Sequence, residues 1–296
     1  MCSFAGIIVL NDAPITRRSE EALANALGWH RPVQRPHIQR TAHAFFAQTD
    51  VPLSRRGDVL FAASSRLDNR AEIAATAGAT GAVDEADCMR SAFEARGDAG
   101  IAQILGVFAF AHWNEPTLTL TLARDYIGRR SLFYYAGRDF VAFASHIGTL
   151  FALPEVPREL DERMLANFLA LNHRERESTF YRGICRVPSR TVVRITRAGI
   201  NQRSYWSPNC EASPPFSRDE DYIARARELF DRAVVRTLRD TPRAAIYLSG
   251  GLDSSAVAAT AARLRTADAI QVYHRRRSTG LHDRAGISTN ARRSRR

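Results

Sequence analysis

A chain of 296 residues, of which 45% are apolar, can bury a sizeable core in one large domain or two ordinary ones. No stretch approaches the ~18 continuous apolar residues of a membrane-spanning helix, and the amino terminus lacks the features of a secretory signal. The four cysteines form no CxxC pair, so neither a zinc site nor a disulfide framework is expected. We therefore expect a cytoplasmic protein with reduced thiols and no membrane partner.

The net charge of +11 comes from arginine alone, because the chain contains no lysine, and much of it lies at the carboxyl end. Residues 274–296 hold eight arginines and one acid, whereas the preceding 273 residues hold 34 arginines and 30 acids. Basic tails can contact nucleic acid or acidic surfaces. This one has no aromatic side chains to stack on bases, so we expect a disordered, solvated tail and no nucleic-acid partner.

The first two thirds of the chain are rich in strand patterns. The apolar run 3–10 is typical of a buried strand, and residues 19–27 have helical spacing with Ser19 as the expected N-cap. Short apolar or alternating runs bounded by Gly, Asn, Pro and Asp predict further strands at 43–49, 59–67, 106–113, 118–125, 131–137 and 139–145. Helical spacing recurs at 84–97 and 162–171. Residues 1–207 therefore predict an α+β domain.

A different pattern follows a Pro/Ser/acid-rich linker at 208–220. A strongly periodic amphipathic helix is expected from residue 221 to 238, then a strand at 244–248, a helix at 254–264 and a strand at 269–273. This alternation predicts a βαβ unit with a parallel sheet over residues 221–273.

The expected second domain is incomplete. Residues 274–296 have almost no apolar period and cannot supply the missing strands and helices. A change of reading frame near residue 273 would produce such a switch in composition.

The stretch SGGLDSS, residues 249–255, joins the expected strand and helix of the βαβ unit. Two glycines allow close approach of the backbone, and the first amides of the helix lack intrahelical partners at its positive end. With the serine hydroxyls these amides predict a phosphate-binding turn. Asp253 would repel phosphate alone, so it is expected to cap the helix or to contact magnesium. A tight turn with serine caps is the alternative.

SGGLDSS resembles the pyrophosphate-binding loop of N-type ATP pyrophosphatases, in the form found in asparagine synthetases. The resemblance implies ATP and Mg²⁺ as cofactors. It places Ser249, Gly250, Gly251, Asp253, Ser254 and Ser255 at the phosphates, and Leu248 and Val272 near the nucleoside.

The other end of the chain resembles a class II glutamine amidotransferase domain. Met1 precedes Cys2, which is small enough for Met1 to be removed. The terminal amine then exposed has a pKa of about 8, so it can accept the proton of a nucleophilic thiol beside it. Further stretches resembling this family are residues 106–113, 122–135, 143–153, 180–189 and 203–206. The resemblance implies a four-layer αββα (Ntn-type) fold with Cys2 as the nucleophile.

The chain departs from that family at the expected glutamine site. Ser64, Ser65 and Arg66 stand where glutamine-hydrolysing members carry Asn-Gly-Glu, whose first two residues stabilise the oxyanion. Ser64 and Ser65 remain candidate glutamine-binding residues. Asp87 matches the acid that contacts the glutamine amine, although an exposed helix acid would look the same. The arginine expected to hold the substrate carboxylate has no clear counterpart near residues 43–48.

The resemblance implies an ATP-dependent ligase that adenylates aspartate or another carboxylate and forms an amide with ammonia from glutamine. Two alternatives stay open. The Ser-Arg-Leu-Asp-Asn-Arg variant is familiar from lasso-peptide cyclases and β-lactam synthetases, which use a substrate amine, and a peptide would then be the substrate. A chain without lysine and without the later synthetase elements could instead be an inactive remnant that at most binds nucleotide. The acceptor and the oligomeric state, including a homodimer, are not settled by the sequence.

Overall fold

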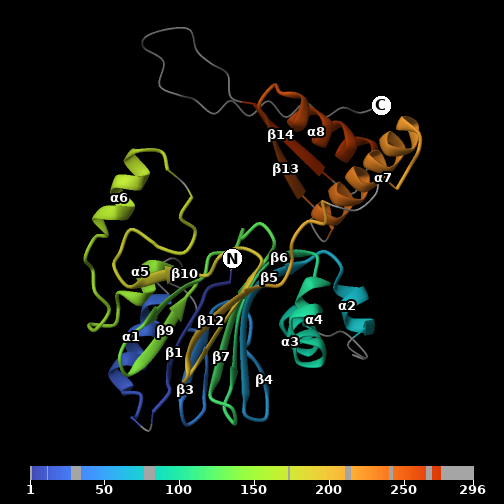
Figure 1. Cartoon of the computed structure of the whole chain (residues 1–296). Coiled ribbons are helices and arrows are strands. Elements are labelled where there is room, and N and C mark those ends of the chain that lie inside the picture. The colour runs from blue at the N-terminus through green and yellow to red at the C-terminus, as the bar shows by residue number, and fades with distance from the viewer. Residues whose placement is uncertain are drawn as a thin grey trace. The chain divides into compact units, whose positions relative to one another are not determined.

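The structure is a computed structural model that describes residues 2–11, 13–27, 35–76, 84–172, 174–210, 215–239, 243–264 and 269–274. The chain divides into two compact units, Met1–Pro208 and Asn209–Arg296 (Figure 1). The expected arginine-rich tail lies outside the described residues. No described helix combines the length and the apolar character that crossing a bilayer would require.

The first unit contains a six-stranded antiparallel sheet, here called sheet one, in the order β10-β8-β9-β1-β3-β2. Its strands are β1 (Phe4–Val9), β2 (His37–Arg40), β3 (Ala44–Gln48), β8 (Phe133–Ala136), β9 (Phe140–Ala144) and β10 (Ile184–Arg186). The strand nearest the amino terminus thus lies in the middle of sheet one. All six residues of β1 are buried, as the apolar run predicts.

A second six-stranded antiparallel sheet, sheet two, has the order β12-β11-β7-β6-β5-β4. Its strands are β4 (Ser54–Arg56), β5 (Val59–Leu67), β6 (Gly106–Asn114), β7 (Thr119–Arg124), β11 (Thr191–Thr196) and β12 (Gly199–Ser204). The sequence predicts β5 to the residue. It misses β2 and β4, which are short and rich in polar side chains, and also β10, β11 and β12.

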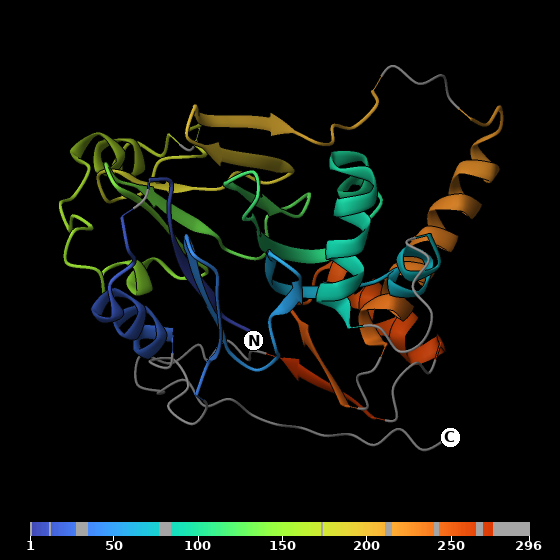
Figure 2. The same cartoon turned by 90° about the horizontal axis from the view of Figure 1, so that it is seen from below.

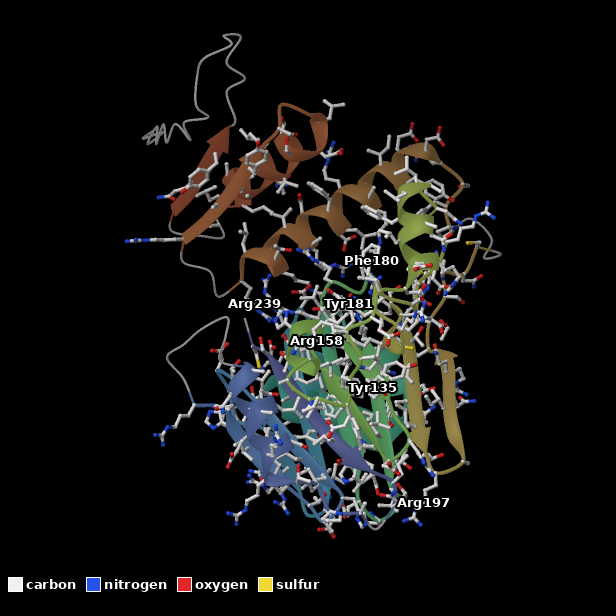
Figure 3. The ribbon with its side chains drawn as sticks, turned by 90° about the vertical axis from the view of Figure 1, so that its left-hand side faces the viewer. Tyr135, Arg158, Phe180, Tyr181, Arg197 and Arg239 are labelled. Carbon is white, nitrogen blue, oxygen red and sulfur yellow. The ribbon has the colours of Figure 1, made fainter. Side chains whose placement is uncertain are left out.

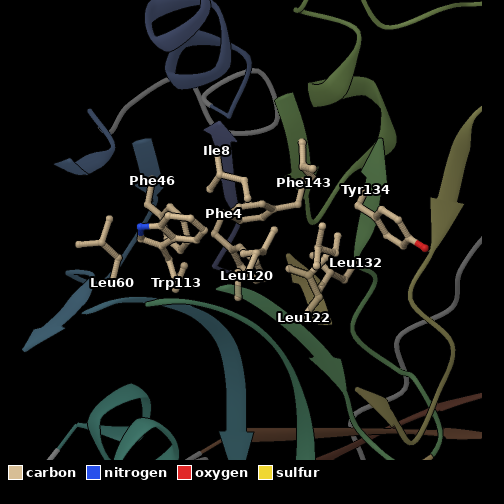
Figure 4. Packing of buried hydrophobic residues seen from close by; sticks show 14 of the residues in the cluster. Phe4, Ile8, Phe46, Leu60, Trp113, Leu120, Leu122, Leu132, Tyr134 and Phe143 are labelled. Carbon is tan, nitrogen blue, oxygen red and sulfur yellow. The ribbon is translucent and has the colours of Figure 1, made fainter. Parts of the chain in front are cut away.

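The two sheets pack face to face over the main core. Phe4, Ile8, Leu60 and Trp113 are fully buried there, with alternate residues of facing strands pointing inward (Figure 4). Neighbouring residues on the same strands point outward and are covered by helices, as Ala63 of β5 and Ala5 of β1 show.

Helices cover both outer faces of the pair of sheets. The helices of this unit are α1 (Arg17–Leu27), α2 (Arg70–Thr76), α3 (Glu85–Arg96), α4 (Asp98–Ala102), α5 (Ile147–Leu150) and α6 (Glu162–Leu169). Helix α1 packs on β1 and β3, and α3 packs on β5. The layers are therefore helix, sheet, sheet, helix, which confirms the predicted αββα fold.

The first helix begins earlier than its apolar spacing predicts, and Ser19 is not its N-cap. Helix α1 starts at Arg17, and Ser19 lies inside its first turn. The hydroxyl of Thr16 accepts a hydrogen bond from the Ser19 amide at 3.2 Å, so Thr16 satisfies the free donor. Two arginines precede Ser19 and carry no apolar signal, which explains the misplaced boundary.

The second unit is a small α/β structure, built from α7 (Asp219–Leu238), β13 (Arg243–Leu248), α8 (Leu252–Leu264) and β14 (Ala269–His274) (Figure 2). Strands β13 and β14 are parallel, with Ile246 opposite Val272. The buried core consists of Val234, Leu238, Ala244 and Ala261. This confirms the incomplete parallel-sheet domain, within the residues described.

Two side chains join sheet one to sheet two at opposite ends of β1. At one end, Arg197 donates through Nε to the carbonyl of Leu10 (Figure 3). At the other end, the fully buried Gln48 accepts the Ala63 amide of β5 through Oε1 at 2.9 Å. Its Nε2 donates to the carbonyls of Val51 and Pro52, each at 3.2 Å. Gln48 therefore has both ends of its amide satisfied.

We predict that Gln48→Leu lowers the free energy of unfolding by about 1–3 kcal/mol, because a buried amide and two carbonyls lose their partner. Urea unfolding followed by tryptophan fluorescence measures the change. Gln202→Leu, on the exposed strand β12, is the matched control and should change it by less than about 0.5 kcal/mol. Equal effects of the two substitutions would contradict the bridging role of Gln48.

Candidate active site

Cys2 lies directly before β1, between the two sheets. Its Sγ is 3.0 Å from the carbonyl oxygen of Thr49, which follows β3 in sheet one. It is also 3.5 Å from the carbonyl oxygen of Ala63, in sheet two. The half-buried thiol is thus held by backbone groups of both sheets.

The edge of β5 that faces Cys2 carries a backbone donor. The amides of Ala63 and Leu67 point away from β6, because they donate to Gln48 and to Glu85 Oε1. Peptide groups alternate along a strand, so the amide of Ser65 points to this same edge. Strand β4 pairs only with Val59–Phe61, and no acceptor for the Ser65 amide occurs in the described part of the chain. An N–H donor therefore lies near the thiol.

The side chains of Ser64 and Ser65 point to opposite faces of sheet two. Ser64 is only 3% exposed and shares its face with Leu60 and Ala62 of the inter-sheet core, which is the face toward Cys2. The Ser65 hydroxyl instead points to α3 and donates to Glu85 Oε2 at 2.9 Å. Ser64 can contribute its hydroxyl to the site, whereas Ser65 can contribute only its amide.

Asp87 lies on α3 within a polar cluster. Its Oδ1 accepts hydrogen bonds from the Ser54 hydroxyl and, at 3.3 Å, from Nη2 of Arg90. Arg90 also donates to Glu94 at 3.0 Å. The Asp87 carboxylate retains 43% side-chain exposure, so an amine would have to share it with Ser54 and Arg90.

The electrostatic environment keeps the Cys2 thiol protonated while Met1 is attached. Burial raises the pKa of the thiol to about 12, and the negative charge of Asp50 adds to the shift. The charge of Arg130 opposes it. A thiol of this pKa needs a base to form thiolate near neutral pH.

We predict slow, pH-dependent alkylation of Cys2 in chains that retain Met1. At pH 8 the thiolate fraction is about 10⁻⁴ for a pKa near 12 and about a quarter for an ordinary cysteine, so iodoacetamide should react about 10³-fold more slowly than in urea. The rate should rise about tenfold per pH unit, because the thiolate fraction does. Peptide mass spectrometry measures it, with exposed Cys210 as the internal control.

The same digest separates the amino-terminal peptides that retain or lack Met1. The form lacking Met1 should react faster, because its terminal amine can take the thiol proton. Equal rates for native and unfolded Cys2 would contradict the predicted environment.

In the second unit, the turn between β13 and α8 is exposed, and Gly250 has a positive φ of 86°. The Ser249 and Ser254 hydroxyl oxygens are 3.1 Å apart. The Ser249 amide donates to Ser254 Oγ at 3.2 Å, and the Gly251 amide to Ser249 Oγ at 3.3 Å. The serines therefore hold the turn in shape from within.

Four amides of this turn have no acceptor among the described residues, namely those of Gly250, Leu252, Asp253 and Ser254. No atom within 4 Å would meet a Cβ at Gly250, so the space above the backbone is open. Free amides at the start of a helix suit a phosphate group. Asp253 lies in the first turn of α8 and is not its N-cap, which corrects the capping expectation and leaves magnesium as its predicted contact.

The two expected nucleoside contacts lie on neighbouring strands. Leu248 is the last residue of β13 and leads directly into the turn. Val272 is 41% exposed and pairs with Ile246, two residues before the end of β13. Since the strands are parallel, Leu248 is adjacent to the phosphate-binding turn and Val272 is one step further away.

Gln48, Thr49, Glu85 and Arg130 surround the Cys2 site without being predicted. The sequence marks Gln48 as unusual, because it is a polar residue that ends an otherwise apolar strand. The sequence does not mark the other three, since their positions depend on which strands lie side by side.

Among the described residues, no group of three or more His, Cys, Asp or Glu side chains is placed to hold a metal ion.

Comparison with known proteins gives matches to both units. Residues 68–206 match the family described as "Glutamine amidotransferase domain", and residues 225–283 match "Asparagine synthase". Glutamine-hydrolyzing asparagine synthetase 3 of Bacillus subtilis (strain 168) is 33% identical over 158 residues, which are 53% of this chain and 25% of that protein.

Two further relatives extend the match. Asparagine synthetase 2 of the same organism is 29% identical over 294 residues, covering 88% of this chain and 39% of that protein. A putative asparagine synthetase of Mycobacterium tuberculosis (strain ATCC 25618 / H37Rv) is 32% identical over 207 residues, covering 67% of this chain and 31% of that protein. The chain thus spans less than half the length of these curated relatives.

Proposed function

Because the chain belongs to the glutamine-hydrolysing asparagine synthetase family, with a class II glutamine amidotransferase domain followed by part of an ATP pyrophosphatase domain, we propose that it takes part in ATP-dependent amide formation from glutamine. Residues 1–207 would release ammonia and residues 221–273 would hold the phosphates of ATP, with 208–220 as the linker. The observation that carries the proposal is the Cys2 thiol at the Ala63 carbonyl, on the edge of β5 to which the Ser65 amide also points.

In the proposed first half-reaction, the Cys2 sulfur attacks the side-chain amide carbon of glutamine. The carbon–nitrogen bond breaks, the thiol proton leaves with the nitrogen as ammonia, and a thioester remains. The Ser65 amide, aided by the Ser64 hydroxyl, would stabilise the oxyanion formed on the way. Water then hydrolyses the thioester to glutamate and restores the thiol.

In the proposed second half-reaction, a carboxylate attacks the α-phosphorus of ATP and pyrophosphate leaves. The four free amides of the turn from residue 249 to 255 would bind the phosphates, and Asp253 would contact the accompanying Mg²⁺. Ammonia then displaces AMP from the acyl adenylate and forms the amide. Aspartate is the carboxylate that the names of the relatives favour.

One feature favours a second candidate, a ligase that uses an amine of its own substrate. The Ser65 hydroxyl and the Leu67 amide both bond to Glu85, so the edge of β5 is tied to α3. A site tied in this way, without the Asn-Gly-Glu sequence, suits a domain that keeps the fold but does not admit glutamine.

Glutamate release from L-glutamine separates the two candidates. We predict measurable release by the full chain, lowered about 10³-fold or more by Cys2→Ser, because the nucleophile is lost. Cys185→Ser, a change to a half-buried thiol on β10, is the control and should leave the rate within about twofold. No release above the Cys2→Ser background, with native folding confirmed, would favour the amine-using ligase.

Nucleotide binding tests the second half. We predict that the full chain binds MgATP and that Gly251→Val weakens binding at least about tenfold, because the side chain would cover the free amides. Gly251 lacks a positive φ, and a Cβ there lies 3.4 Å from Ser249 Oγ, so the turn tolerates the change. Ala262→Val, near the other end of α8, is the control. If calorimetry shows no MgATP binding by the unsubstituted chain, the proposed nucleotide-binding role is wrong and only the proposed release of ammonia from glutamine remains.

A further inference from the structure

A polar cavity of about 450 Å³, here called the α6 cavity, lies in the first unit between α6 and the ends of β7 and β10. Its volume is in the range of small-molecule sites. Of the described residues, neither Cys2 nor the turn at 249–255 lines it, so it is separate from both sites described above. Its polar wall includes Arg124, Asn167, Arg176, Arg186 and Ser189.

The arginines of the α6 cavity offer free cationic groups. Arg124 is only 7% exposed, and its guanidinium donates to three backbone carbonyls. The Arg186 guanidinium carbon lies 5.9 Å from the ring centroid of Phe133, and this group makes no hydrogen bond or ion pair with a described residue. The exposed Arg176 guanidinium also has no such partner in the described chain. Two guanidinium groups are therefore available to a ligand.

The cations of this cavity act on one another. Burial lowers the pKa of Arg124, and the charge of Arg186 adds to the shift, whereas the charge of Asp125 opposes it. Asp125 itself is 1% exposed, and its carboxylate accepts backbone amides, including that of Gly128 at 2.7 Å. It therefore does not offer its charge to the cavity.

The one acid in the described lining, Glu175, is already engaged. Its Oε1 accepts the amides of Arg176 and Glu177, each at 3.1 Å, and its Oε2 accepts Nη1 of Arg163 at 3.4 Å. Three arginines and one glutamate give the lining a net charge of +2. An anion of about two charges would balance it.

Neutral side chains add further hydrogen-bond donors. Asn167 accepts through Oδ1 from Nδ2 of Asn172 at 3.3 Å, and its own Nδ2 has no acceptor in the described chain. The Ser189 hydroxyl makes no hydrogen bond with a described residue either. Together with the two guanidinium groups, these donors suit an anion that carries several oxygen atoms.

One wall of the α6 cavity is aromatic. Phe168 of α6 and Phe180, which Figure 3 labels, meet edge to face with their ring centroids 5.4 Å apart. Both rings are partly exposed, at 53% and 40%. Met164 and Pro188 extend the apolar wall. A ligand that fills the cavity needs an apolar body beside its anionic group.

We propose that the α6 cavity binds a phosphate monoester with an aromatic body. A phosphate monoester carries about −1.5 to −2 charges near neutral pH and three acceptor oxygens, which matches the net charge and the separate donors of the lining. A carboxylate has one charge and two oxygens in a single plane, so it would leave part of this set unused. The inference does not depend on the functions proposed for Cys2 and for the turn at 249–255.

Binding in this cavity would stabilise α6, which is weakly attached. None of its eight residues is buried. Arg163 fastens it to the opposite wall through Glu175, at 3.4 Å, and through the Ser178 hydroxyl, at 3.1 Å. Helix amides with so little burial should exchange their hydrogens quickly, and a ligand that contacts α6 should slow this exchange.

The test uses phenyl phosphate and the full chain at pH 8. Calorimetry measures the dissociation constant, and hydrogen exchange followed by mass spectrometry shows which amides are protected at saturation. We expect saturable binding and slower exchange in α6. Gly251→Val separates this site from the phosphate-binding turn, because it covers the turn and leaves the α6 cavity unchanged.

Two substitutions test the lining. Arg186→Gln should raise the dissociation constant about 10- to 100-fold, because a charge-assisted hydrogen bond is lost. Asn167→Asp should weaken binding by a similar factor, because it replaces a donor with a negative charge at nearly constant shape. Arg182→Gln is the matched control, since Arg182 has a 59% exposed side chain on the same segment and does not line the cavity, and it should change the constant by less than about twofold.

Several results would overturn the inference. These are no saturable binding of phenyl phosphate, unchanged exchange in α6 at saturation, or a dissociation constant that is equal in Arg186→Gln, Asn167→Asp and the unsubstituted chain. Loss of all binding in Gly251→Val would assign the phosphate to the turn instead. Phenylacetate binding as tightly as phenyl phosphate would show that the cavity does not select a phosphate group.

Discussion

The hydrogen bond from the Ala63 amide to Gln48 fixes how the two sheets meet at the end where Cys2 lies. Gln48 is fully buried and its amide group is satisfied on both sides, so neither its position nor its orientation can change without leaving a polar group unpaired. The Ala63 carbonyl contacts the Cys2 thiol, and the Ser65 amide follows one pleat further along the same edge. One buried side chain therefore ties β3, which precedes the Thr49 carbonyl at the thiol, to the edge of β5 that carries the Ser65 amide.

A backbone donor explains how part of the site can tolerate the unusual sequence at residues 64–66. Any residue at position 65 supplies an N–H in this place, so the replacement of Gly by Ser keeps the amide. The replacement of Asn by Ser at position 64 is more severe, because a hydroxyl is shorter than a carboxamide. In the proposed glutamine site, Arg66 stands where the family it resembles carries an acid, so position 66 would not supply a carboxylate for the substrate.

The sequence predicts the two sites to different degrees because they are built differently. The turn at residues 249–255 is held by hydrogen bonds between residues at most five apart. The local sequence of seven residues is therefore enough to predict the turn. The Cys2 site joins residues that are 47 and 61 positions apart. Strand positions such as β5 follow from alternation, but Gln48 and Arg130 become visible only when the order of strands is known. Polar edge strands such as β4 escape prediction because they bury little apolar surface.

The small core of the second unit has a consequence for the glycine turn. Four buried side chains, among the residues described, provide little apolar burial to offset the conformational entropy of ordering two helices and two strands. A ligand that binds only the ordered turn would share its binding energy with folding, so its measured affinity falls short of the intrinsic affinity by the cost of ordering. The bound phosphate group would then stabilise the folded turn as well as being its ligand. The amides of the turn would exchange their hydrogens more slowly when the phosphate is bound.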